Sequence, residues 1–260
     1  MKYELKTALI ILSLFFLSQV IGLFVIGQNI KVSGVESLTP SENTIDALYV
    51  LPFSIVIITV VFLILYKLKL DKFLIIWYSL AFITCVSVTL ASFINEIYAL
   101  IIAVVLLVIR FDAKDDNIFH NMTELLVYAG LSVLLLPSLG MESMIILLIL
   151  ISAYDVFAVN FSKHMIVLAK TQLSLNIFSG FKVKVNNNIA ALGGGDVVLP
   201  LILAGIMLRD VSPLSAILVV YGSFLGLLVL ILTGDENKVY PAMPYITAGC
   251  ILGLIINSFL

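Results

Sequence analysis

Apolar and polar residues follow one another along this chain in long blocks, with apolar runs of about 20 residues separated by short charged or turn-forming segments. A run of this length can cross the hydrocarbon core of a bilayer as a helix. The pattern predicts nine spans, at about residues 8–28, 46–66, 73–94, 97–110, 122–138, 141–162, 188–208, 212–233 and 242–260. The first is longer than the apolar part of a typical signal peptide and lacks a clear cleavage site, so we expect it to remain as a span.

Composition supports the same class. Hydrophobic residues make up 62% of the 260 positions and charged residues 12%, which exceeds what the core of a soluble domain needs. We therefore expect an all-α polytopic membrane protein with a single membrane domain over residues 1–260. Cys85 and Cys250 both lie in apolar runs and do not suggest a disulfide framework.

The basic residues predict the orientation of the spans. With nine spans and a cytoplasmic N-terminus, all of the 14 Lys and Arg residues except Lys31 and Arg209 lie on the cytoplasmic side. If residues 97–110 did not cross, the later loops would change sides and this bias would be lost. Cytoplasmic loops are enriched in Lys and Arg, so we expect the C-terminus outside. Spans 1–6 then occupy residues 1–162, a cytoplasmic loop residues 163–187, and spans 7–9 residues 188–260.

Two acidic residues lie well inside predicted spans: Asp155 in the sixth and Asp196 in the seventh. An Asp at the centre of a spanning helix costs about 2.5–3.5 kcal/mol on insertion scales, so it usually has a function. Both lie about eight residues, or ~12 Å, from the cytoplasmic ends of their spans. Two carboxyl groups that face each other in a low-dielectric site can share one proton, leaving a base to activate water and an acid to protonate the scissile bond.

The residues around Asp196 indicate an irregular backbone. Gly193, Gly194 and Gly195 precede it, and glycine weakens a helix while admitting close neighbours. Pro200 cannot donate a hydrogen bond to the carbonyl of Asp196. We expect a loosened helical turn there, which a bilayer tolerates only where protein or water surrounds it.

Three short motifs stand out: Tyr154-Asp155 in one span, the GxGD pattern Gly193-Gly194-Gly195-Asp196 in the next, and Pro241-Ala242-Met243 at the start of the last. Together they resemble the presenilin and signal peptide peptidase family of GxGD intramembrane aspartyl proteases, and most of all its prokaryotic, particularly archaeal, homologues. Their order, their spacing and the nine-span plan all agree with the family. The sequence departs from it at Gly194, where members often carry a bulkier residue, and at Met243, where leucine is usual and methionine has a similar volume.

This resemblance implies an intramembrane aspartyl endopeptidase with Asp155 and Asp196 as the catalytic pair. It also implies that the other motif residues support the active site: Tyr154, Gly193, Gly194, Gly195, Pro241, Ala242 and Met243. A structural polar pair remains the plain alternative for the two acids.

A possible substrate-binding strand lies in the loop before the seventh span. Phe181, Lys182, Val183, Lys184 and Val185 alternate with period two, and Val and Phe favour strands. The free edge of such a strand could hold an unwound substrate extended beside Asp196. The alternative is a mobile basic loop attracted to anionic headgroups.

Other chemistries find less support. The sequence has no H-E-x-x-H zinc motif, no G-x-S-G and no phosphate-binding loop, and His120 and His164 fall in separate predicted loops. A prepilin peptidase-like GxGD protease and an ion transporter or channel with paired intramembrane Asp residues remain alternatives. We expect transmembrane peptides or proteins and the lipid bilayer as partners, no nucleic acid, and no metal or organic cofactor. A homo-oligomer stays open, and the predicted location is the cell membrane of a prokaryote.

Overall fold

The computed structural model describes residues 5–34, 61, 70–113, 116–159, 172, 177–185, 188–234 and 240–259. Within these ranges the chain forms eight α-helices, one short 3-10 turn (Leu136–Ser138) and one two-stranded antiparallel sheet. In order, the elements are α1 (Leu5–Ser33), α3 (Asp71–Ala91), α4 (Glu96–Asp112), α5 (Asn117–Leu135), α6 (Met141–Phe157), β1 (Gly180–Val185), β2 (Asn188–Gly193), α8 (Gly194–Asp210), α9 (Pro213–Thr233) and α10 (Met243–Ser258).

These helices match eight of the nine predicted spans, and the second, at 46–66, lies outside the described residues apart from Val61. In the described part of the chain, four helices are long and apolar enough to cross a membrane: Lys6–Val32, Asp71–Ala91, Asn117–Ser138 and Pro213–Thr233. The other four contain 16 or 17 residues each. The count of nine spans and their orientation therefore stay predictions.

Side-chain caps fix where several helices begin. Asn95 accepts a hydrogen bond from the backbone of Ile97 at the start of α4, and Asp116 accepts from Ile118 and Phe119 at the start of α5. Because of the Asp116 cap, α5 begins at residue 117 rather than at the predicted 122. The prediction that His120 lies in a loop was therefore wrong.

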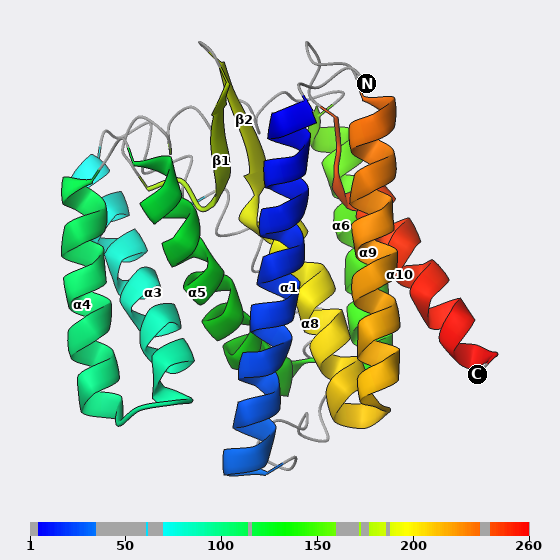
Figure 1. Ribbon diagram of the computed structural model, residues 1–260, viewed down its shortest axis with the longest axis horizontal. Coiled ribbons are helices and arrows are strands. Elements are labelled where there is room, and N and C mark those ends of the chain that lie inside the picture. The colour runs from blue at the N-terminus through cyan, green and yellow to red at the C-terminus, as the bar shows by residue number, and fades with distance from the viewer. Residues whose placement is uncertain are drawn as a thin grey trace.

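The helices lie side by side, and α8 is at their centre (Figure 1). It packs against α1, α5, α6 and α9. Leu201, Ile202, Leu203, Ala204 and Ile206 are all 0% exposed, so α8 is apolar and buried on every side. The hairpin of β1 and β2 lies at the same end of the bundle as the start of α1, and α10 ends towards the other end (Figure 1).

Two further contacts fix the helices that carry the motifs. A Cβ atom on Gly222 of α9 would collide with the backbone carbonyl of Gly249 of α10, so these helices approach to backbone contact. At the end of α8, Arg209 donates hydrogen bonds to the carbonyl oxygens of Leu136 (2.9 Å) and Leu139 (3.2 Å). That arginine fastens α8 to the connection between α5 and α6.

Candidate active site

The segment before Asp196 is a strand. We predicted a helix from residue 188, but β2 occupies Asn188–Gly193 and α8 begins at Gly194. The strand pairs with β1 from Gly180↔Gly193 to Val185↔Asn188, which satisfies backbone groups that a looser turn would leave unpaired. Pro200 lies inside α8, which continues to Asp210, and the change from strand to helix falls between Gly193 and Gly194.

Asp196 is therefore the third residue of α8 rather than a residue deep inside a span. Its half-buried carboxyl group accepts a hydrogen bond from the backbone N–H of Gly193, the residue that caps the helix. An acid at this position satisfies a backbone donor that the helix leaves free, as in a capping box.

Asp155 lies near the end of α6 and has a similar environment. Asp155 is only 7% exposed. Its Oδ2 accepts a hydrogen bond from the backbone N–H of Met243, the first residue of α10, at 3.2 Å. Ala242 and Met243 are buried beside it. One turn away, the hydroxyl groups of Ser152 and Thr247 are 2.7 Å apart and join the same two helices. Each acid is thus held at the N-terminus of a helix.

The two acids lie on helices that pack together. α6, which carries Asp155, packs against α8, which carries Asp196, and against α10. The carboxyl groups, the backbone N–H donors beside them and the N-termini of α8 and α10 therefore belong to one group of packed helices. Such a site can hold one negative charge and one proton, which is what acid–base chemistry on an amide requires.

The remaining motif residues differ in their placement. Tyr154 is 43% exposed and lies on a different face of α6 from its neighbour Asp155. A Cβ atom on Gly194 would lie 3.1 Å from a ring carbon of Tyr128 and 3.2 Å from the carbonyl of Ser179, whereas Gly195 has nothing within 4 Å. The absence of a side chain at Gly194 therefore makes room for the ring of Tyr128. This contact explains why glycine stands at 194, where members of the family often carry a bulkier residue.

The strand predicted at 181–185 is confirmed as β1. The prediction that this strand has a free edge for substrate is not confirmed. The backbone N–H and carbonyl of Lys182 both bond to the side chain of Asn121, and His120 bonds to the carbonyl of Gly180. These groups face away from β2, so side chains of α5 already occupy the outer edge of β1. In the alternating antiparallel pattern, the outward groups of β2 belong to Ile189, Ala191 and Gly193, and the N–H of Gly193 already bonds to Asp196.

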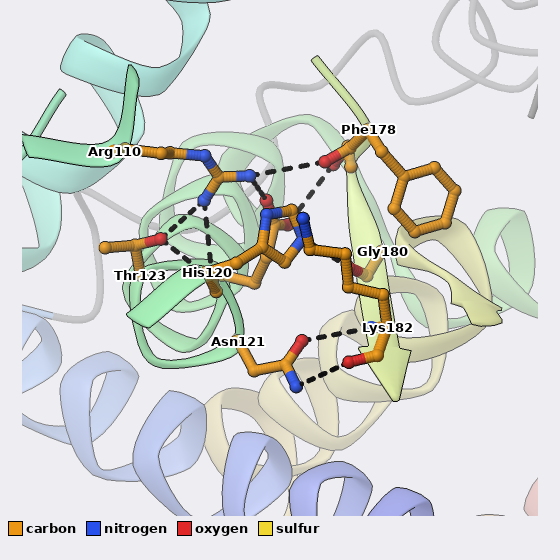
Figure 2. A network of polar contacts seen from close by, with 9 residues as sticks. Arg110, His120, Asn121, Thr123, Phe178, Gly180 and Lys182 are labelled. Atoms are coloured by element: carbon orange, nitrogen blue, oxygen red, sulfur yellow. Dashed lines mark hydrogen bonds and ion pairs between the residues drawn. The ribbon is translucent and has the colours of Figure 1, made fainter. Parts of the chain in front are cut away.

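A buried polar network next to the hairpin escaped the sequence analysis (Figure 2). Arg110 of α4 forms an ion pair with Glu124 of α5 and donates to Thr123 and to the carbonyl of Phe178. The span predicted at 122–138 begins five residues later than α5 does, so the prediction gave no sign that Glu124 lies inside the helix. The capping residue Asp116 was the signal that could have corrected this.

Within the described residues, no three His, Cys, Asp or Glu side chains group in a way that could hold a metal ion.

Comparison with known proteins identifies the fold. No protein-family model matches the sequence, and no curated protein matches it either. Two solved structures of a presenilin family intramembrane aspartate protease are similar to it. The structure in space group C222 has a TM-score of 0.72 at 18% identity and covers 97% of this chain and 98% of its own. The structure in space group P2 has a TM-score of 0.70 at 19% identity, with 96% of each chain covered. The chain has a presenilin-like fold over nearly its whole length.

Proposed function

We propose that this chain, with its presenilin-like fold, is an intramembrane aspartyl endopeptidase that hydrolyses peptide bonds of transmembrane helices or signal peptide remnants. The observation that carries the proposal is the placement of Asp155 and Asp196 on two packed helices of an apolar bundle, each beside a helix N-terminus. Chemistry and fold agree here, because the similar structures are those of aspartate proteases.

In the proposed reaction, the two carboxyl groups hold one proton between them and a water molecule lies between them. The ionised carboxylate takes a proton from this water as its oxygen attacks the scissile carbonyl carbon, and the protonated acid gives its proton to the carbonyl oxygen. Collapse of the tetrahedral gem-diol breaks the C–N bond. The leaving amine takes the proton of one carboxyl group, a hydroxyl of the diol gives its proton to the other carboxylate, and the dyad again holds one proton. The backbone donors of Gly193 and Met243 keep the carboxyl groups oriented throughout.

The outer edge of β2 is the proposed substrate-binding surface. A helical substrate hides its peptide bonds in its own hydrogen bonds, so it must be extended before cleavage. The outward backbone groups of Ile189 and Ala191 can pair with an extended segment, and the strand leads directly to Asp196. This replaces the predicted role of β1 as the strand that receives substrate.

Substrates enter from the lipid in this proposal, and the charge bias favours segments whose N-terminus is outside. The protein is then a multi-pass component of the cell membrane of a prokaryote. Its apolar exterior agrees with this location, since large side chains such as Trp77, Phe93, Ile97 and Tyr98 are exposed on α3 and α4 and in the turn between them.

The proposal is tested with the purified protein in liposomes and a panel of peptides that span the bilayer, with products identified by mass spectrometry. We expect cleavage within the spanning segment by the wild-type protein and a loss of about 10²–10⁴-fold for Asp155→Ala and for Asp196→Ala separately. Asp112→Ala, which changes an exposed carboxylate at the end of α4, is the matched control and keeps its activity. Intact peptides combined with ion-dependent flux would contradict the proposal and favour a transporter.

A further inference from the structure

The first residues of α5 cover the edge of β1 that faces away from β2. Asn121 donates from Nδ2 to the carbonyl of Lys182 at 2.9 Å, and its Oδ1 accepts the N–H of Lys182 at 3.0 Å. One residue earlier, Nε2 of His120 lies 2.9 Å from the carbonyl oxygen of Gly180. Both side chains are buried, and Figure 2 shows them directed at the strand.

The amide group of Asn121 makes the same pair of bonds that a neighbouring strand would make. In an antiparallel sheet, a hydrogen-bonded residue pair exchanges one N–H···O=C bond in each direction. A primary amide offers one donor and one acceptor side by side and can replace that strand residue. At Lys182, Asn121 therefore closes an edge that could otherwise pair with another extended chain.

The hairpin held in this way is connected by short steps to Asp196. The carbonyl of Ser179 accepts the N–H of Gly194 at 3.1 Å, and Gly194 is the first residue of α8. The carbonyl of Phe178 accepts from Arg110 at 3.2 Å, and Phe181 packs against Tyr128 with ring centroids 5.2 Å apart. A shift of β1 along α5 would therefore move β2 and the start of α8 with it.

We propose that Asn121 is a positioning residue for proteolysis, because its pairing with Lys182 fixes the hairpin in the register that leaves β2 as the substrate-receiving edge beside Asp196. This rests on the proposed function. Asn121 touches neither substrate nor the reacting atoms and acts through the hairpin. A mobile hairpin has to be ordered when substrate binds, and that ordering weakens binding. A mobile hairpin also lets substrate pair with β2 in neighbouring registers. A shift of the substrate by two residues keeps the same set of its side chains facing the site.

The test compares three variants in proteoliposomes with one bilayer-spanning peptide. Asn121→Leu removes both hydrogen bonds at similar size, and Asn121→Asp keeps the acceptor for the Lys182 N–H while removing the donor. Asn29→Leu is the matched control, because Asn29 is half-buried and bonds Ser92 at 2.7 Å between α1 and the end of α3, away from the hairpin. The readouts are kcat, KM, the distribution of cut sites, thermal unfolding and amide hydrogen exchange over residues 180–185.

We expect Asn121→Leu to raise KM by roughly tenfold, which corresponds to about 1.4 kcal/mol and to the loss of one or two net hydrogen bonds. We expect kcat to stay within about twofold, new products displaced by two residues to appear, and exchange over 180–185 to increase. Asn121→Asp should show a smaller rise in KM, and it carries the test if the leucine variant does not fold. Asn29→Leu should leave KM and the cut sites unchanged.

If Asn121 had only a structural role, Asn121→Leu would lower the fraction of folded protein and hence the apparent kcat. KM and the cut sites would then stay at their wild-type values. That result, or equal changes in Asn29→Leu, or unchanged exchange over 180–185, would overturn the inference while leaving the proposed function standing. Failure of the wild-type protein to cleave any spanning peptide would instead overturn the proposed function, and this inference with it.

Discussion

The buried ion pair between Arg110 and Glu124 gives a quantitative prediction for stability. Their side chains are only 3% and 1% exposed, and Arg110 also lies over the rings of Tyr78 (5.5 Å) and Phe82 (5.1 Å). Breaking a buried pair by removing one partner typically costs about 3–5 kcal/mol, because the other charge is left without compensation. We therefore expect Arg110→Met and Glu124→Gln each to lower the free energy of unfolding by about that amount.

The double variant separates the ion pair from the rest of the network. With both charges removed, no uncompensated charge remains, and the residual cost is chiefly that of the Phe178 carbonyl and the Thr123 hydroxyl, which lose their donor. Each such loss costs about 1–3 kcal/mol. The double variant should therefore be more stable than the sum of the single costs predicts, with a coupling of about 4 kcal/mol.

The assay is unfolding of the purified protein in mixed micelles, followed by circular dichroism, for the wild type, both single variants and the double variant. Asp112→Asn is the surface control and should change stability by no more than about 0.5 kcal/mol. If the single costs added in the double variant to within about 0.5 kcal/mol, the pair would not be coupled and the reasoning would be refuted.

Two further predictions concern the hairpin and the start of α8. Gly194→Ala should lower stability by about 1–3 kcal/mol, because its Cβ would lie 3.1 Å from the ring of Tyr128, whereas Gly195→Ala, with open space around it, should be neutral or stabilising in thermal unfolding. Val183→Pro removes a backbone donor that faces β2 and should greatly reduce cleavage of spanning peptides, while Lys184→Pro, whose N–H faces away from β2, should reduce it less. Equal losses in the two proline variants would contradict the register described for the hairpin.

The helices and the acids could be predicted from the sequence because their signals are local. Apolar runs of sufficient length mark the spans, and the alternation at 181–185 marks β1. The pairing of Asp155 with Asp196 was predicted from motif resemblance and matching depth. The structure places them on helices that pack together, with Asp196 at a helix start and not in mid-span, and their pairing stays a prediction.

The features that escaped prediction depend on contacts between distant segments. The residues at 188–193 are compatible with a strand and with the first turns of a helix, so their apolar content does not distinguish the two. Pairing with β1 makes this segment a strand. The occupation of the β1 edge by Asn121 depends on how α5 packs on the hairpin, and no sequence period reports that. The burial of Glu124 beside Arg110 likewise required the tertiary arrangement of α4 and α5.

The central claim is that Asp155 and Asp196 act together on a water molecule, and a transition-state mimic tests it most directly. The measurement is the Kd of a spanning peptide in which a hydroxyethylene group replaces the scissile amide, relative to the unmodified peptide. The account predicts binding to the wild-type protein at least about 10²-fold tighter than that of the plain peptide. It also predicts that this advantage disappears in both Asp155→Ala and Asp196→Ala. Equal affinity for the two peptides, or an advantage that survives either substitution, would contradict the claim.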